Sequence, residues 1–229
     1  MAFYDLHVHT NLSIGENTID EMVDFAKRLG LSGIGVVRYF PAQEEIVNRD
    51  DFDLVNVIML KASKPEELSE MIKKTRKKAE VLMVHGGDFD INRAACEDPM
   101  VDVLCHPEFN RKDSGLDHIC VKAAAENDVA IEVNFRELAE SYKLHRIRVL
   151  AAIRRNIDLC KRFNTPLITS SSAVSRWGLR SGRELASIAN LLGLDLVKSI
   201  ETTSLIPENI VLHNREKLQN KRWEGARIV

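Results

Sequence analysis

Short apolar runs alternate with amphipathic segments along the whole chain. Runs rich in Val, Ile and Leu lie at residues 2–9, 32–40, 53–62, 81–87, 101–107, 130–135 and 166–172. Most are nearly continuous in apolar residues, which is typical of parallel strands buried on both faces. The segments between them have the apolar spacing of helices, so the chain reads as a series of strand–helix units.

Helical spacing and capping residues predict helices in the intervening segments, at residues 18–30, 63–79, 90–98, 114–129, 141–164, 182–193 and 207–218. In the first, Thr18 is the expected N-cap, Glu21 stands three residues later and Gly30 ends the helix. On the longest, an apolar stripe at helical spacing is expected to face inward: Leu144, Ile147, Leu150 and Ile157.

Seven such repeats, with no long linker or composition break, predict a TIM-like (β/α) barrel with a helical C-terminal end. We expect a single domain over residues 1–229. An eighth strand would lie near residues 195–200, although this segment could equally be helical. A doubly wound open sheet is the alternative fold.

Composition argues against a disordered chain and against a membrane-spanning protein. Hydrophobic residues make up 45% of the 229, enough to build a large core, and no apolar run approaches membrane-spanning length. The cysteines form no CxxC pair and look like scattered core residues: Cys96, Cys105, Cys120 and Cys160. A reduced, cytoplasmic compartment is therefore the expected location.

The net charge of −2 conceals a gradient along the chain. Residues 1–128 carry 15 Lys and Arg against 24 Asp and Glu, whereas residues 129–229 carry 17 against 10. The simplest explanation of this charge gradient is that the charged residues lie on solvated helix surfaces, and the gradient by itself favours this explanation. A basic half that meets a polyanion is the second interpretation.

Polar and charged residues stand at nearly every predicted strand end, where β/α barrels carry their functional groups. Asp5, His7 and His9 alternate along the first strand, so their side chains are expected on one face, as at the start of a metal site. The later strand ends carry Arg38 and Tyr39, Lys61, His85 to Asp88, His106, Asn134 to Arg136, and Ser170 to Ser172.

The stretch DLHVHTNLS, a histidine ending the fourth strand and HP ending the fifth resemble the polymerase-and-histidinol-phosphatase (PHP) phosphoesterases. That resemblance implies a distorted barrel with a multinuclear metal centre. The family's S-D-G, D-H and D-x-H motifs are replaced here by Ser13-Ile14-Gly15, Arg38-Tyr39 and Ser172-x-Val174, and Lys61 stands where a carboxylate is expected.

Clustered divalent cations need anionic bridging ligands, so these replacements predict a broken hydrolytic site with no catalytic residues and no cofactor. Positive charge from Arg38, together with Lys61, would instead attract phosphate. Two alternatives stay open: a metal-dependent phosphoesterase, or one zinc ion held by the histidines His7, His9, His85 and His106.

A second resemblance covers the chain from about residue 1 to the end. Residues 84–118, 130–138 and 166–185, above all NRKDSGLDH and the serine-rich seventh strand, are similar to protein component 3 of archaeal and eukaryotic ribonuclease P. It implies a PHP-like barrel that serves as a non-catalytic protein subunit of the enzyme that removes 5′ leaders from precursor tRNA. The implied partners are the ribonuclease P RNA, precursor tRNA, protein component 2 and the other protein subunits.

Basic residues expected at strand ends or in the loops beyond them are the candidate RNA contacts: Arg38, Arg93, Arg111, Lys112, Arg136, Arg176, Arg180 and Arg183. Guanidinium groups bind phosphate oxygens bidentately, and Asn110, Asn134 and Ser170 to Ser172 could hydrogen-bond phosphates or 2′-hydroxyls. Aromatic residues are only 6% of the chain, so base stacking is a poor primary mode of RNA binding.

Trp177 is either an exposed RNA contact or a lid that packs over the barrel mouth. A barrel that only bridges proteins is a third reading of the chain.

Overall fold

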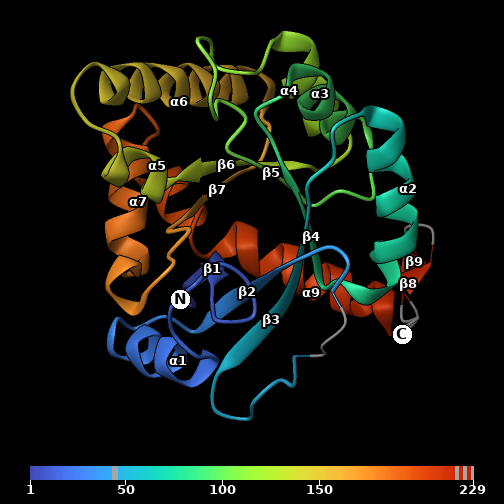
Figure 1. Cartoon of the computed structure of the whole chain (residues 1–229), viewed down its shortest axis with the longest axis vertical. Coiled ribbons are helices and arrows are strands. Elements are labelled where there is room, and N and C mark those ends of the chain that lie inside the picture. The colour runs from blue at the N-terminus through green and yellow to red at the C-terminus, as the bar shows by residue number, and fades with distance from the viewer. Residues whose placement is uncertain (43–45, 220–221, 224–225, 228–229) are drawn as a thin grey trace.

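The computed structural model describes residues 1–42, 46–219, 222–223 and 226–227. Seven parallel strands form one sheet in the order of the sequence: β1 (Tyr4–His9), β2 (Gly33–Tyr39), β3 (Asp53–Leu60), β4 (Val81–His85), β5 (Val103–Cys105), β6 (Ala130–Asn134) and β7 (Leu167–Ser170). A bridge between Val8 and Ala173 joins β1 to the residues after β7, so the sheet curls back on itself (Figure 1). This confirms the predicted barrel, because a doubly wound sheet reverses its strand order.

Helices surround the sheet: α1 (Ile19–Arg28), α2 (Pro65–Thr75), α3 (Phe89–Glu97), α4 (His118–Glu126), α5 (Phe135–Glu140), α6 (Lys143–Phe163), α7 (Gly182–Leu191), α8 (Leu196–Glu201) and α9 (Leu205–Leu218). Two 3-10 turns, η1 (Arg76–Lys78) and η2 (Arg176–Gly178), and a hairpin of β8 (Arg222–Trp223) and β9 (Ala226–Arg227) complete the described chain. The segment considered for an eighth strand is the helix α8, and α5 is a helix that the sequence pattern did not predict.

Two helix starts are fixed by capping side chains, and the first of them, at Thr18, is the predicted one. Thr18 accepts a hydrogen bond from the backbone of Glu21, whose carboxylate accepts one from the Thr18 backbone in return. Asp117 accepts from the backbone N–H groups of Ile119 and Cys120 and so begins α4. Each cap satisfies backbone donors that have no partner inside the helix.

The barrel interior is apolar at its N-terminal end. Side chains from the first halves of the strands, Val55, Val81 and Val103, belong there to one core cluster with Ile210 and Val211 of α9, which crosses this end of the barrel (Figure 1). Thr202 and Thr203 follow α8 and accept hydrogen bonds from the backbones of Thr169 and Tyr4. These residues bridge β7 and β1 at the position where an eighth strand would close the sheet.

The stripe predicted on α6 is wrong in its first half. Leu144 and Ile147 are exposed, whereas Val149 and Ile153 are buried, and Ile157 is buried as predicted. A helix of 21 residues is about 31 Å long, well over the length of the short strand β6 beside it. The first two turns of α6 therefore extend past the edge of the sheet, where Leu144 and Ile147 stay exposed among the described residues.

The cysteines are all buried and free, as expected for scattered core residues. Within the described residues, no helix is both long enough and apolar enough to cross a membrane.

Gly115 and Gly30 provide a matched pair for a test of stability. Both have φ near 72°, but a Cβ on Gly115 would lie 1.9 Å from the Pro107 carbonyl oxygen, whereas a Cβ on Gly30 would meet nothing within 4 Å. We expect Gly30→Ala to lower the free energy of unfolding by about 1 kcal/mol, from backbone strain alone. Gly115→Ala should lower it by roughly 3 kcal/mol, because Pro107 must also move. Urea denaturation measures both losses, and equal losses would contradict this account.

Candidate nucleic-acid interface at the barrel mouth

A buried carboxylate stands at the centre of the barrel mouth. Glu132 lies in the middle of β6 and faces the interior, where His7 Nδ1 donates to its Oε1 over 2.6 Å. Ser170 Oγ donates to the same oxygen, and Asn134 Nδ2 donates to Oε2 over 3.0 Å. One carboxylate thus joins β1, β6 and β7.

Burial opposes ionisation of Glu132, but attraction to His7 and the hydrogen bonds from His7 and Asn134 outweigh it. The pKa of Glu132 is therefore held well below its ordinary range, and the group stays charged. The sequence reasoning missed this residue and treated the expected carboxylates as absent. The available signal was a lone charged residue inside the apolar run 130–135.

The four histidines gather at the mouth, but their ring nitrogens are largely occupied. His7 Nε2 lies 3.1 Å from His9 Nε2, and His9 Nδ1 lies 3.1 Å from Ser13 Oγ. Asn134 Nδ2 donates to His106 Nδ1 over 3.0 Å, and His85 Nδ1 donates to the Gly86 carbonyl over 2.9 Å. Burial lowers the pKa of His9 to about 2 and that of His106 to about 3, so both rings are neutral at neutral pH.

Asp5 does not join the histidines as the strand alternation predicted. The pairing of β1 with β2 is irregular between Asp5 and Val8, and this irregularity breaks the alternation. The Asp5 carboxylate instead accepts from the backbone of Ser171 over 3.1 Å and of His7 over 3.4 Å. Burial raises the pKa of Asp5 to about 6.

The residues present do not fit a multinuclear metal centre. Within the described chain, one set of three metal-ligand atoms lies within 4.8 Å of one another, from His7, Cys105 and Glu132. Burial raises the pKa of the Cys105 thiol well above its ordinary value, so the sulfur keeps its proton. Glu132 is the set's one carboxylate, and its oxygens already accept from His7, Ser170 and Asn134.

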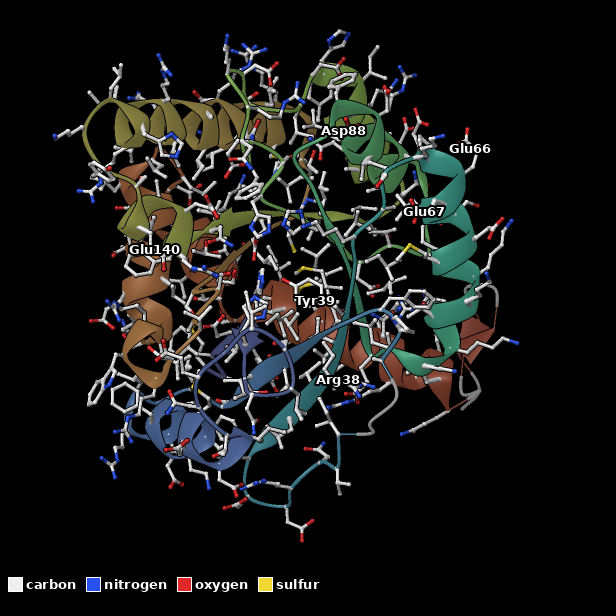
Figure 2. All side chains as sticks on the ribbon, viewed as in Figure 1. Arg38, Tyr39, Glu66, Glu67, Asp88 and Glu140 are labelled. Carbon is white, nitrogen blue, oxygen red and sulfur yellow. The ribbon has the colours of Figure 1, made fainter. Side chains whose placement is uncertain are left out.

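Arg38 does not face the mouth, contrary to the sequence-based expectation. Its guanidinium lies on the outer side of β2, where it donates to Asn56 of β3. Tyr39 faces the histidines instead, and its ring stacks on His9 with the centroids 6.0 Å apart. Figure 2 shows Tyr39 nearer the middle of the barrel than Arg38. Successive strand residues face opposite sides, so a one-residue difference in position decides this outcome.

Three other predicted contacts are helical rather than in loops. Arg93 lies on the exposed side of α3 and pairs with Glu97 over 2.8 Å. Arg136 begins α5 and pairs with Glu140 over 3.0 Å, while Arg183 is exposed in the first turn of α7. Arg136 and Arg183 still adjoin the mouth, because they lie in the first turns of α5 and α7, which start at that end of the barrel, whereas Arg93 is exposed on the outer side of α3.

The remaining predicted cations lie in strand–helix connections, which open on one end of a parallel barrel. Together with Arg136 and Arg183, they form a group that we call the mouth rim: Arg111, Lys112, Arg136, Arg176, Arg180 and Arg183. Three contacts position two of its members. Arg111 donates to the Asp113 carboxylate over 2.6 Å and to the Gly87 carbonyl over 3.0 Å. The Arg180 guanidinium lies 5.0 Å from the ring centroid of Phe135, the residue before Arg136.

The polar groups expected to contact RNA beside these cations are mostly committed elsewhere. Asn134 and Ser170 are fully buried and hydrogen-bonded to Glu132, and Ser171 and Ser172 are buried as well. They therefore build the mouth instead of presenting donors to a ligand. Asn110 sits in the loop with Arg111 in a left-handed conformation, with φ of 56°.

A small cavity lies beside the rim and contains an unusual carboxyl group. It measures about 60 Å³ and is lined by Glu108, Glu137, Arg111, Lys112, His145 and Arg148, among others. Neither Glu108 oxygen has a hydrogen-bond partner among the described residues. Burial raises the pKa of Glu108 to about 8, and the charges of Glu137 and Glu132 add to that effect.

Comparison with known proteins identifies the family of this chain. A family model described as RNase P subunit p30 matches residues 2–219. The chain belongs to this family. Ribonuclease P protein component 3 of Methanosarcina barkeri is 39% identical over 217 residues, covering 93% of this chain and 90% of the relative. The protein of the same name from Methanococcoides burtonii is 38% identical over 229 residues, covering 99% and 94%.

Solved structures agree with the fold of this p30-family chain. A chain in a cryo-EM structure of archaeal ribonuclease P with mature tRNA has a TM-score of 0.79 at 24% identity, over 96% of this chain and 95% of that one. Histidinol phosphate phosphatase from Lactococcus lactis has a TM-score of 0.53 at 10% identity, with 93% of each chain covered. At such identities the likeness concerns the barrel fold alone.

The raised pKa of Glu108 predicts that the stability of the protein depends on pH. Its folded-state pKa of about 8 exceeds the ordinary 4.5, so stability falls as pH rises from about 4.5 to about 8. Glu108→Gln should remove that loss. The free energy of unfolding of the variant relative to the wild type should therefore grow with pH, by up to about 1.4 kcal/mol per pH unit.

Chemical denaturation at pH 5, 6, 7 and 8 measures this difference. Glu140→Gln changes an exposed carboxylate of α5, labelled in Figure 2, and serves as the control. Its curve should run parallel to that of the wild type. A Glu108→Gln curve that is also parallel would contradict a buried, unpartnered carboxyl group.

Proposed function

We propose that this chain is a non-catalytic, RNA-binding protein subunit of an archaeal ribonuclease P, the ribonucleoprotein that removes the 5′ leader of precursor tRNA. Membership of the p30 family and the names of its relatives support the assignment to ribonuclease P. The observation that carries the RNA-binding role is the mouth rim itself. Its cations surround a mouth whose own ionisable groups are paired with one another or neutral.

The proposed partners are the ribonuclease P RNA, precursor tRNA, protein component 2 and the other protein subunits. The similar chain in the archaeal ribonuclease P structure with mature tRNA supports this set. We propose the cytoplasm as the compartment, in line with four free cysteines. The RNA subunit would carry the chemistry, so no catalytic group and no cofactor is assigned to this chain.

Rim residues differ in how freely they can meet a phosphate. Among the described residues, Lys112, Arg176 and Arg183 form no ion pair. Arg111 and Arg136 already pair with Asp113 and Glu140, so an RNA phosphate would have to share them. Charge-assisted contacts to phosphate release counterions and make binding depend on salt. We therefore expect the unpaired cations to contribute most of that dependence.

A metal-dependent phosphoesterase has less support. The donor atoms such an activity would use are engaged in hydrogen bonds with one another, and the mouth supplies too few anionic groups to bridge clustered cations. A barrel that only bridges proteins would leave the rim cations without a role.

Reversing rim charge tests the RNA-binding role directly. In the double variant Lys112→Glu with Arg183→Glu, two exposed cations are replaced without breaking an ion pair of the described structure. We expect affinity for ribonuclease P RNA to fall about tenfold, and the slope of log affinity against log salt to become shallower by about two. Filter binding from 50 to 300 mM salt measures both quantities.

Cleavage of precursor tRNA by the reconstituted enzyme, with this chain limiting, should fall in parallel. Arg93→Glu provides the control, because it reverses a charge on α3 away from the rim and should leave the salt slope unchanged. An unaltered slope in the double variant would rule out the rim as the RNA contact.

A further inference from the structure

Trp177 is exposed on a turn of the mouth rim. It lies in η2, after β7, and 67% of its surface is open to solvent. This exposure excludes the lid that the sequence left as an alternative, because a lid would pack its indole over the barrel mouth. A large aromatic side chain left in water on a fixed turn suggests a partner that covers it.

The turn that presents Trp177 is held from several sides. The backbone N–H of Arg176 donates to Asn17 Oδ1 over 2.9 Å, and Arg180 Nη1 donates to the Trp177 carbonyl over 2.9 Å. The ring of Phe25, from α1, meets the indole nearly edge-on with the centroids 5.5 Å apart. The indole is therefore preorganised, and a ligand that covers it need not order it first.

Positive charge surrounds the indole. The Arg176 guanidinium carbon lies 4.8 Å from the ring centroid and forms no ion pair among the described residues. Arg180 follows within the same connection, and Arg183 stands in the first turn of α7, directly after it. Two acidic residues of this region, Glu21 and Glu184, accept hydrogen bonds in the capping boxes of α1 and α7. The surface thus combines an open π-face, a planar guanidinium and cations suited to phosphate.

We propose that Trp177 and Arg176 form a stacking site for an unpaired RNA base, with the adjoining phosphates on Arg180 and Arg183. Nucleobases stack on aromatic rings and on guanidinium planes, and such stacking tolerates any base. A duplex keeps its bases inside and cannot use the site. This inference rests on the proposed function and adds to it a preference for single-stranded RNA.

Trp177 can report its own contact. The chain has two tryptophans, so a Trp223→Phe background leaves Trp177 as the single indole fluorophore. The full chain is titrated with a twelve-nucleotide oligoadenylate and with a twelve-base-pair RNA duplex at 50 mM salt. We expect the single strand to quench Trp177 strongly at saturation and the duplex to quench it little.

Affinity for the oligoadenylate is then measured by anisotropy of a labelled strand. Trp177→Leu should weaken binding about tenfold without changing the salt slope, because stacking releases no counterions. Trp177→Phe should recover most of that loss. The matched control is Tyr142→Leu, which removes an aromatic ring that is 69% exposed and also adjoins a cation, Lys143. It should leave the affinity unchanged.

The outcomes separate this inference from the proposed function. Salt-dependent binding that persists while Trp177 is unquenched, or while Trp177→Leu has no effect, would overturn the stacking site and leave the RNA-binding role standing. Quenching by protein component 2 but not by RNA would make the surface a protein interface and would likewise overturn it. No salt-dependent binding of any RNA would overturn both.

Discussion

The buried carboxylate of Glu132 connects the strands at the mouth of the barrel. Glu132 accepts from His7, Ser170 and Asn134, and Asn134 also donates to His106. Through this carboxylate, β1, β6, β7 and the residue after β5 are tied together on the side of the barrel where β7 meets β1 through a single bridge. A buried charge persists only when partners compensate its lost hydration. The closed barrel and its polar mouth therefore depend on the same interaction.

This arrangement decides what the mouth can bind. The nitrogen and oxygen atoms that could coordinate a cation are hydrogen-bonded to one another, and burial keeps His9 and His106 neutral. The charge available to a ligand then comes from the rim, where guanidinium and ammonium groups stand on strand–helix connections and on the first turns of α5 and α7. The barrel fold resembles that of a histidinol phosphate phosphatase, and here it carries cations around a mouth whose own ionisable groups are paired or neutral.

The candidate site was predicted unevenly from the sequence, for reasons of geometry. Arg111 and Lys112 were placed correctly, because the turn after β5 has strong local signals. Arg38 was expected at the mouth, where Tyr39 lies in its place, because which of two neighbours faces inward depends on the register of the whole sheet. Glu132 was overlooked, because its partners come from strands far away in the chain. Leu144 and Ile147 look buried by their spacing, and only the position of α6 against the sheet shows that they are exposed.

By itself the sequence determined the strand–helix order, the helix start at Thr18, the barrel and the family, because these follow from apolar periodicity, capping and local motifs. Only the tertiary structure decided which histidine nitrogens are occupied, which carboxylate stands between them, which arginines are paired and that Trp177 is open to solvent. Those properties arise from contacts between residues that are distant along the chain. The spacing of apolar residues along the chain does not indicate such contacts.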